Sequence, residues 1–252
     1  MRKIMSLCYT QLRYAALMVR HPHVARDFWF HLYHEARIAD KLAQPSLKYR
    51  LPIKDVGDIF PGIYAQEYSL ESYCDEYGAV SPFEARVLAA SIRLLKPKTL
   101  FEIGTFHGGT TVQIALNAPA DAVVNTLDLP EDHPLRADRD NVDLSPERLG
   151  KRYKVSSVAN KIHQLYGNSM EFDFSPFARS CDWIFVDAAH TYDYVMSDTR
   201  NALAMLRPGG TIFWHDVNMA FEGTCRALAE YANSNQFPIV RVRGTTLACY
   251  RS

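Results

Sequence analysis

The stretch Thr99-Leu-Phe-Glu-Ile-Gly-Thr-Phe-His-Gly-Gly-Thr-Thr111 decides the fold. Its first five residues are mostly bulky and apolar, as in a strand that is buried on both faces of a parallel sheet. The apolar run breaks at Gly104 and resumes after a pair of glycines with a helix-like pattern. The stretch therefore predicts a strand, a glycine-rich turn and a helix, and the glycines allow the backbone of the turn to approach a ligand closely.

The spacing of the glycines distinguishes this turn from a dinucleotide-binding turn. A dinucleotide-binding turn has the pattern G-x-G-x-x-G, whereas here three other residues separate Gly104 from the next glycine. Glu102 lies inside the strand, where a carboxylate is costly to bury without partners. We expect it to accept hydrogen bonds near the ammonium group of a ligand or from amides of the turn. The turn residues expected to contact the ligand are Gly104, Thr105, Phe106 and Gly108.

The composition is that of a soluble globular protein. The chain has 252 residues, of which 48% are hydrophobic, and this is ample for a core. Lys plus Arg and Asp plus Glu number 28 each, so no net charge points to nucleic acid or a membrane as the main partner. Five scattered cysteines lack C-x-x-C spacing, which indicates a reducing compartment without a disulfide framework or a zinc site. We expect a cytoplasmic protein with neither a signal peptide nor a transmembrane segment.

The first part of the chain differs from the rest. Residues 2–43 mix apolar and basic residues at helical spacing, with a dense aromatic cluster at residues 29–33, and residues 44–78 are rich in Pro, Gly and Tyr. We interpret residues 1–80 as a helical extension with a linker or cap, and residues 81–252 as the ligand-binding domain. The helices could pack on the domain or join two subunits into a homo-oligomer, while a membrane-surface helix is the open alternative.

From residue 81 onward, helices and strands alternate. Ser81-Pro-Phe-Glu84 has the form of a capping box with proline at the first helical position, so a helix begins there. The last segment, residues 238–250, reads as a hairpin that turns at Gly244 and contributes a reversed final strand. The pattern predicts an α/β fold with a mostly parallel sheet of seven strands. Besides the hairpin, the expected strands are residues 99–103, 122–128, 161–166, 183–186 and 211–216.

Polar residues follow these strands in succession. Asp128 ends the second strand, Asp187 ends the fourth, and His215 and Asp216 end the fifth. Ligands of open parallel sheets bind along the edge where the strands end. An acid at the end of the second strand can accept both ribose hydroxyls of an adenosyl nucleoside, so we expect this role for Asp128. In this fold class the turn after the third strand lies against the adenine. Asn168 and Ser169 occupy that turn here and are candidates for contact with the adenine.

Two motifs resemble a known family. The pattern E-x-G-x-x-x-G-G of residues 102–109 resembles motif I of the class I S-adenosylmethionine-dependent methyltransferases, in particular their small-molecule O-methyltransferases. Residues 187–190, with the polar pair at the next strand end, are similar to the catechol and caffeoyl-CoA types. They are closer still to methyltransferase family 24, which is related to the macrolide sugar O-methyltransferases. The resemblance spans residues 81–250. It implies a Rossmann-like sheet, S-adenosylmethionine as cofactor, and a sugar, phenol or secondary metabolite as acceptor.

The resemblance also implies roles at the last two strand ends. Asp187 and the pair at 215 and 216 would hold Mg²⁺, and His190 falls where relatives carry a general base. Here the pair is His-Asp, and histidine is a poor ligand for this hard cation. The candidate metal set of Asp187, His215 and Asp216 leaves three possibilities open: no metal, the two aspartates with water, or Mn²⁺, Fe²⁺ or Zn²⁺. Asp187 and His190 are the candidate catalytic residues, with the imidazole removing the proton of the acceptor hydroxyl.

Other functions share parts of this pattern. An NAD-dependent oxidoreductase has the same strand, turn and strand-end acid, but not this glycine spacing. A polyamine synthase needs a stronger acidic cluster than residues 187–190 provide. Methyltransferases acting on nucleic-acid amino groups usually carry an Asn- or Asp-Pro-Pro-Tyr element, which is absent from the sequence. A non-catalytic protein with the methyltransferase fold stays an open alternative.

Overall fold

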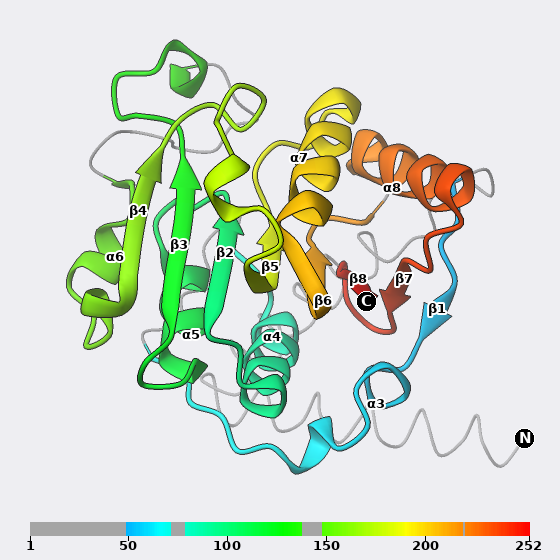
Figure 1. The fold of residues 1–252 in the computed structure, drawn as a ribbon, viewed down its shortest axis with the longest axis horizontal. Helices are drawn as coiled ribbons and strands as arrows, with labels where there is room; N and C mark the ends of the chain where they lie inside the picture. Colours follow the sequence, from blue (N-terminus) through cyan, green and yellow to red (C-terminus); the bar gives the residue numbers. More distant parts are fainter. Residues whose placement is uncertain (1–48, 72–78, 138–147, 219) are drawn as a thin grey trace, which may run out of the picture. The chain divides into compact units, whose positions relative to one another are not determined.

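A computed structural model describes residues 49–71, 79–137, 148–218 and 220–252 (Figure 1). The chain divides into two units, residues 1–43 and residues 44–252. The first unit lies outside the described residues, so the expected N-terminal helices and the subunit contacts remain predictions. The division falls after residue 43 rather than at residue 80, and within the second unit residues 53–54 join the sheet.

The second unit is built on one sheet of eight strands in the order β1-β7-β8-β6-β5-β2-β3-β4. Strand β8 runs antiparallel to both β6 and β7, and all other neighbours are parallel. The predicted α/β sheet with a reversed final strand is therefore confirmed. The strands are β1 (Ile53–Lys54), β2 (Thr99–Ile103), β3 (Val123–Asp128), β4 (Ile162–Tyr166), β5 (Cys181–Val186), β6 (Leu206–Trp214), β7 (Val240–Val242) and β8 (Ala248–Arg251).

The strands at one edge of the sheet and before His215 differ most from the sequence prediction. Strand β1 is an eighth strand, and it pairs with β7 at the edge of the sheet. It has only two residues, both exposed, so it carries none of the apolar signal of a buried strand. Strand β6 begins at Leu206 rather than at residue 211 and ends at Trp214, so His215 and Asp216 lie just beyond the strand.

Helices cover both faces of the sheet (Figure 1). Successive strand residues point to opposite faces. Thus Trp183 and Phe185 of β5 lie in a core with α4 and α5, whereas Ile184 and Val186 lie in a core with α7 and α8. The helices are α3 (Val56–Ile59), α4 (Pro82–Leu95), α5 (Gly109–Asn117), α6 (Lys151–Lys154), α7 (Tyr192–Met205) and α8 (Glu222–Asn235).

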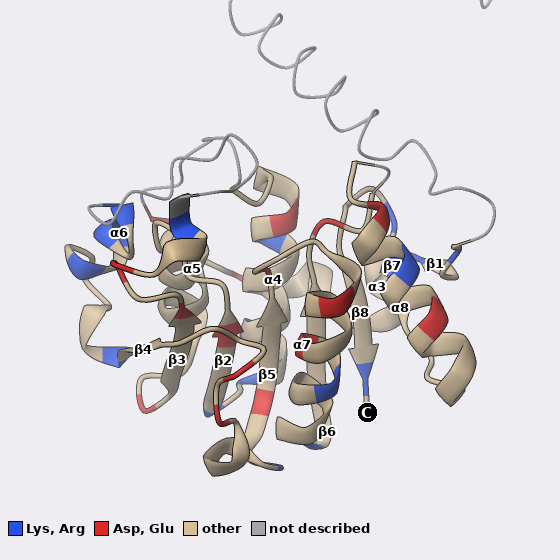
Figure 2. Cartoon of the chain, turned by 90° about the horizontal axis from the view of Figure 1, so that it is seen from above, with Lys and Arg blue, Asp and Glu red and all other residues tan. Residues whose placement is uncertain are grey.

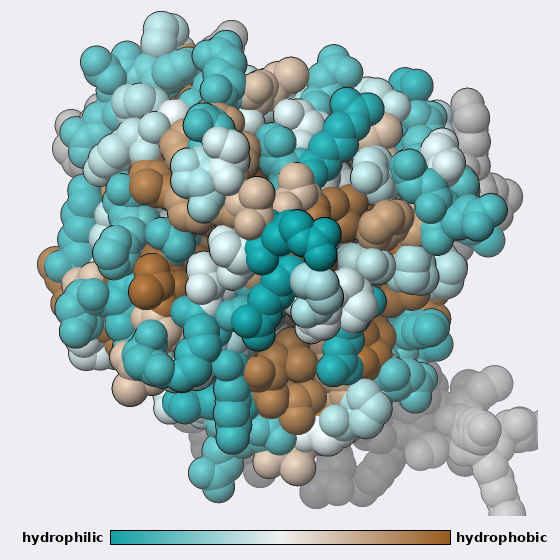
Figure 3. Space-filling model, in the orientation of Figure 1, coloured by the Kyte–Doolittle hydropathy of each residue, from teal (hydrophilic) through white to brown (hydrophobic). Residues whose placement is uncertain are grey.

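The surface agrees with the balanced composition. Acidic and basic residues are scattered over many elements rather than separated by sign (Figure 2). The face shown in Figure 3 mixes hydrophilic and hydrophobic residues. In the described part of the chain, no helix is long and apolar enough to cross a bilayer.

Gly104, directly after β2, lies against the backbone of Asp187, directly after β5. Its φ of +105° is rare for residues with a side chain, and a Cβ atom there would lie 2.1 Å from the carbonyl oxygen of Asp187. The adjacent backbone is fixed by hydrogen bonds from Gly104 N to Leu127 O (2.8 Å) and from Asp187 N to Ile103 O (2.8 Å). Only glycine fits at this position.

The first prediction concerns Gly104→Ala. The variant should lose roughly 2–5 kcal/mol of unfolding free energy, because backbone strain of ~1–2 kcal/mol adds to overpacking of ~1–3 kcal/mol. Urea denaturation measures this loss. Gly209→Ala is the matched control, since Gly209 has a φ of +81° but no atom within 4 Å of the position that a Cβ would take. Equal losses in the two variants would show that contact with Asp187 is unimportant.

Candidate active site

The predicted site residues share one edge of the sheet, as their positions at strand ends imply. Backbone hydrogen bonds link the residues that follow the strands: Gly167 N donates to Asp128 O (2.9 Å), and His215 N donates to Val186 O (3.0 Å). Together with the bonds of Gly104 and Asp187, they make a continuous row across β4, β3, β2, β5 and β6. A ligand at this edge can therefore contact the glycine turn and several strand ends at once.

Glu102 lies in the interior, below the glycine turn. Its Oε2 accepts hydrogen bonds from the hydroxyls of Thr111 (2.5 Å) and Thr126 (2.6 Å), rather than from turn amides. Its Oε1 has no hydrogen-bond partner among the described residues. Burial raises the pKa of Glu102 to about 8, although the two hydroxyls act in the opposite direction. The carboxyl group is therefore largely protonated at neutral pH when no cation lies beside it.

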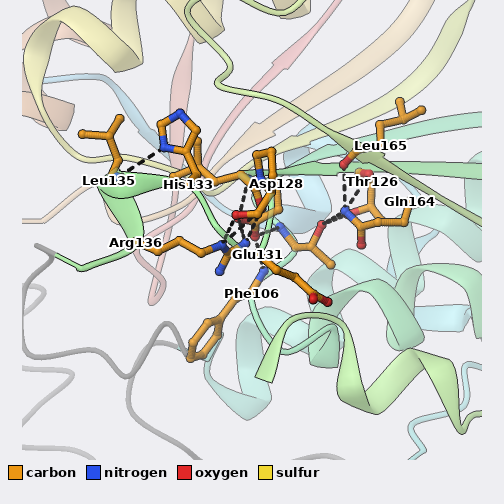
Figure 4. Close-up of polar contacts among 12 residues, drawn as sticks. Phe106, Thr126, Asp128, Glu131, His133, Leu135, Arg136, Gln164 and Leu165 are labelled. Carbon is orange, nitrogen blue, oxygen red and sulfur yellow. Dashed lines mark hydrogen bonds and ion pairs between the residues drawn. The ribbon is translucent and has the colours of Figure 1, made fainter. Parts of the chain in front are cut away.

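Asp128 holds the glycine turn in place (Figure 4). Its Oδ2 accepts hydrogen bonds from the amides of Thr105 (3.0 Å) and Phe106 (2.7 Å). Its Oδ1 accepts hydrogen bonds from the amide of Leu129 (2.7 Å) and from Nη2 of Arg136 (2.7 Å). Burial raises the pKa of Asp128, while the charge of Arg136 and the amides lower it. The strand-end acid is thus an organising residue of the turn as well as a candidate ribose ligand.

A chain of polar side chains continues from the turn to α6. Thr105 Oγ1 lies 2.7 Å from Thr126 Oγ1 and accepts a hydrogen bond from Gln164 Nε2 (3.1 Å). Gln164 Oε1 in turn accepts a hydrogen bond from the hydroxyl of Tyr153 (3.0 Å). Gln164 and Tyr153 were not predicted as site residues, because neither belongs to a motif and their proximity depends on how β4 and α6 pack.

The turn after β4 has its own internal bonds. Asn168 Oδ1 accepts a hydrogen bond from the amide of Met170 (3.2 Å), and Ser169 is buried. The bond between Gly167 and Asp128 places this turn beside the end of β3. The predicted adenine contacts therefore lie next to Asp128, the predicted ribose ligand. The side-chain oxygen of Asn168 already accepts a hydrogen bond within the turn.

Asp187, His190 and Asp216 form a compact cluster at the ends of β5 and β6. One potential ligand atom from each residue lies within 4.8 Å of the other two. Nε2 of His190 lies 3.0 Å from Oδ2 of Asp216, and the imidazole stacks on Phe221 with ring centroids 4.0 Å apart. The His190 side chain is 27% exposed, so solvent or a ligand can reach it. These contacts fix the orientation of the imidazole.

His215 lies behind this cluster rather than within it. Its Nδ1 is 3.0 Å from Oδ1 of Asp187, and its Nε2 is 3.4 Å from Oε2 of Glu84. Burial lowers the pKa of His215, but the carboxylates of Asp216, Asp187 and Glu84 outweigh burial and hold it well above the ordinary value. The three carboxylates therefore favour the protonated form of the buried His215 imidazole. The structure groups His190 with the two aspartates, in place of the predicted set with His215.

Glu84 is the functional neighbour that sequence reasoning missed. The capping box is present, because the amides of Ser81 and Glu84 each bond to the side chain of the other residue. Glu84 Oε1 also accepts hydrogen bonds from the amide (2.6 Å) and hydroxyl (2.7 Å) of Thr246. Burial raises the pKa of Glu84, yet the charge of His215 and these donors hold it well below the usual range. The capping motif indicated only a helix start, and no other sequence signal pointed to the site.

Known proteins with a methyltransferase domain resemble this chain. A family model described as a methyltransferase domain matches residues 101–217. A caffeoyl-CoA O-methyltransferase from Stellaria longipes is 26% identical over 150 residues, which are 58% of this chain and 57% of that protein. The chain thus matches little more than half the length of this curated relative.

Solved structures share the fold. The O-methyltransferase TomG from Streptomyces achromogenes, involved in tomaymycin synthesis and solved with S-adenosylmethionine, aligns with a TM-score of 0.52 at 20% identity, over 69% of this chain and 82% of TomG. An O-methyltransferase from Bacillus cereus, solved with S-adenosylhomocysteine, aligns with a TM-score of 0.51 at 17% identity, over 85% and 97% of the two chains. Residues 101–217 thus match a methyltransferase domain, and the sheet shares the fold of these solved O-methyltransferases.

The second prediction concerns Glu84→Ala. Removing one partner of a buried ion pair should lower the unfolding free energy by about 3–5 kcal/mol at neutral pH. The folded-state pKa of Glu84 is depressed, so its contribution is present above the unfolded-state pKa of about 4.3 and is lost as pH falls toward the folded-state value. Denaturation at several pH values measures both effects.

Glu84→Gln is the matched control, since glutamine preserves the capping box while removing the charge. It should lose less stability than the alanine variant. A difference between Glu84→Ala and the wild type that stays constant from pH 7 to pH 3 would contradict the assignment of a charged Glu84.

Proposed function

We propose that the protein is an S-adenosylmethionine-dependent O-methyltransferase that acts on a hydroxyl of a small molecule. One observation carries the proposal: the glycine turn, Asp128 and the cluster of Asp187, His190 and Asp216 lie on the same edge of one sheet. Such an edge provides a nucleoside site beside a site for proton transfer. The names of the relatives support this reading, because they include a caffeoyl-CoA O-methyltransferase and TomG with S-adenosylmethionine.

The cofactor would extend along the row of strand ends. Asp128 would accept the ribose hydroxyls, and the turn of Asn168 and Ser169 would lie against the adenine. Glu102 would face the ammonium group, since its Oε1 lacks a hydrogen-bond partner among the described residues. The backbone of Gly104, Thr105, Phe106 and Gly108 would line the middle of the site, and Asp187 would border the methyl group.

Methyl transfer requires that the acceptor oxygen lose its proton. The methyl group is already activated on the sulfonium, so the oxygen–methyl bond forms as the sulfur–methyl bond breaks, and the protein must align the two groups. An ionised carboxylate can only accept, so a hydrogen bond to Asp216 would put the proton of His190 on Nε2 and leave Nδ1 as the basic nitrogen. His190 Nδ1 would then take the hydroxyl proton, leaving S-adenosylhomocysteine and the methyl ether as products.

A divalent cation is the second way to activate the hydroxyl. The donor set of two carboxylates and one imidazole suits Mn²⁺, Fe²⁺ or Zn²⁺ better than Mg²⁺. When bound, such an ion would lower the pKa of the acceptor hydroxyl as a Lewis acid. Asp187, His190 and Asp216 would hold it, and His215 would hydrogen-bond to Asp187 from behind. A neutral imidazole has one available nitrogen lone pair, so His190 cannot bind the ion and accept the hydroxyl proton at the same time. Experiments can therefore separate the role of metal ligand from the role of base.

The remaining proposals concern the setting of the enzyme. We propose a homo-oligomer through the helices expected in residues 1–43, and a cap over the acceptor formed by residues 1–80, of which residues 1–48 and 72–78 lie outside the described residues. A cytoplasmic location is proposed from the composition and from the scattered cysteines. The acceptor is proposed to be a sugar, a phenol or a secondary metabolite.

The third prediction concerns cofactor binding. S-adenosylmethionine and S-adenosylhomocysteine should both bind in isothermal titration calorimetry, whereas NAD should not. Asp128→Ala should weaken binding by about 1.5–3 kcal/mol, the range for a hydrogen bond to a charged group. Asp121→Ala is the control, because Asp121 is exposed and pairs with Lys98 away from the strand ends. Binding of NAD alone would reject the proposed function.

The fourth prediction concerns His190→Ala. Once an acceptor is identified, turnover should fall by about 10²- to 10⁴-fold while the affinity for S-adenosylmethionine stays unchanged, because a positioned base contributes this much. Turnover after EDTA treatment, together with Mn²⁺ binding followed by electron paramagnetic resonance, separates the roles of His190. Loss of activity with EDTA and loss of Mn²⁺ binding in His190→Ala identify a ligand. Insensitivity to EDTA identifies a base, and full turnover of His190→Ala excludes both roles.

A further inference from the structure

The carboxylate of Asp128 already has as many hydrogen bonds as its lone pairs accommodate. A carboxylate offers about four acceptor positions. Two amides occupy Oδ2, and one amide and one guanidinium occupy Oδ1. A ribose that donates two hydroxyl hydrogen bonds to this carboxylate must therefore displace at least one of the present donors.

Arg136 is the donor that can leave. The other three donors are backbone amides of Thr105, Phe106 and Leu129, and the chain holds them beside the carboxylate. Arg136 reaches Asp128 only through its side chain, from a short 3-10 turn at residues 134–137. A rotation of that side chain would free one acceptor position on Oδ1 while the three amide donors stay in place.

The guanidinium of Arg136 occupies one acceptor position on Oδ1 of Asp128. Both partners of this ion pair are largely buried, since the Arg136 side chain is 7% exposed and the Asp128 side chain is 16% exposed. Arg136 also donates to the carbonyl oxygens of Leu129 (2.5 Å) and Pro130 (2.8 Å), so the guanidinium is held over the end of β3 (Figure 4). A ribose hydroxyl that donates to Oδ1 would compete with Nη2 of Arg136 for that oxygen.

We propose that Arg136 is an internal competitor for the ribose site, and that binding of a nucleoside with a 2′,3′-diol requires its release from Asp128. The inference rests on the proposed function for the identity of the ligand. Because the bonds of Arg136 to Asp128 and to the two carbonyls are given up on binding, Arg136 lowers the affinity and slows association. It therefore helps to set which nucleosides bind, since only a ligand that replaces its hydrogen bonds displaces it.

Arg136→Ala in the full chain tests the proposal. The variant should bind S-adenosylhomocysteine at least tenfold more tightly in calorimetry, and stopped-flow fluorescence should show faster association. Arg226→Ala is the matched control, since Arg226 forms an exposed ion pair with Glu230 (3.0 Å) on α8 and should leave affinity unchanged. Arg136→Gln shortens the side chain and removes the charge, and it should also bind S-adenosylhomocysteine more tightly than the wild type. It replaces the alanine variant in the test if that variant does not fold.

The gain should depend on the diol and on Asp128. Adenosine should bind more tightly to Arg136→Ala than to the wild type, whereas 2′,3′-dideoxyadenosine should gain nothing. In an Asp128→Ala background, Arg136→Ala should give no further gain. Unchanged or weaker binding of S-adenosylhomocysteine by both folded Arg136 variants would overturn the inference. Failure of the wild type and all variants to bind S-adenosylhomocysteine would instead reject the proposed function.

Discussion

The close approach of Gly104 to the carbonyl of Asp187 is the constraint on which the site depends. It brings the turn after β2 against the residue that ends β5, at a distance that excludes any side chain at position 104. The turn would carry the cofactor, and the end of β5 begins the cluster proposed for proton transfer. A sheet edge alone brings polar residues into a row, but this contact determines how near the two halves of the site lie.

Hydrogen bonds to buried carboxylates keep the two halves of the site ordered. Asp128 is stabilised by three amides and Arg136, and Glu84 is stabilised by the capping box, Thr246 and His215. Buried carboxylates without such donors would be strongly destabilising. Burial leaves the pKa of Asp128 raised as well, but Glu102 is reached by only two hydroxyls, and burial raises its pKa to about 8. We infer that a bound cation stabilises the ionised form of Glu102. The ammonium group of the proposed cofactor is such a cation.

Much of the fold could be predicted from the sequence because its strongest signals are local. The apolar run of residues 99–103, the glycine turn and the capping box at Ser81 each describe a few neighbouring residues, and the structure confirms them as β2, a turn and α4. Asp128 and Asp187 were placed on one edge because parallel strands end on the same side. The two-residue strand β1 could not be predicted, since its residues are exposed and its pairing with β7 spans most of the chain.

The site partners were harder to predict because they depend on side-chain direction and on distant contacts. His215 and Asp216 are adjacent, yet one turns inward to Glu84 and the other toward His190, and the φ of +57° at Asp216 accompanies this change. Arg136 lies in a charged segment without periodicity, so no pattern linked it to Asp128.

A crystal structure with S-adenosylhomocysteine is the most direct test of a cofactor site along this strand edge. The ribose hydroxyls should lie within about 2.6–3.2 Å of the Asp128 carboxylate, and the sulfur should face His190. A ligand bound away from this strand edge would contradict the proposed site.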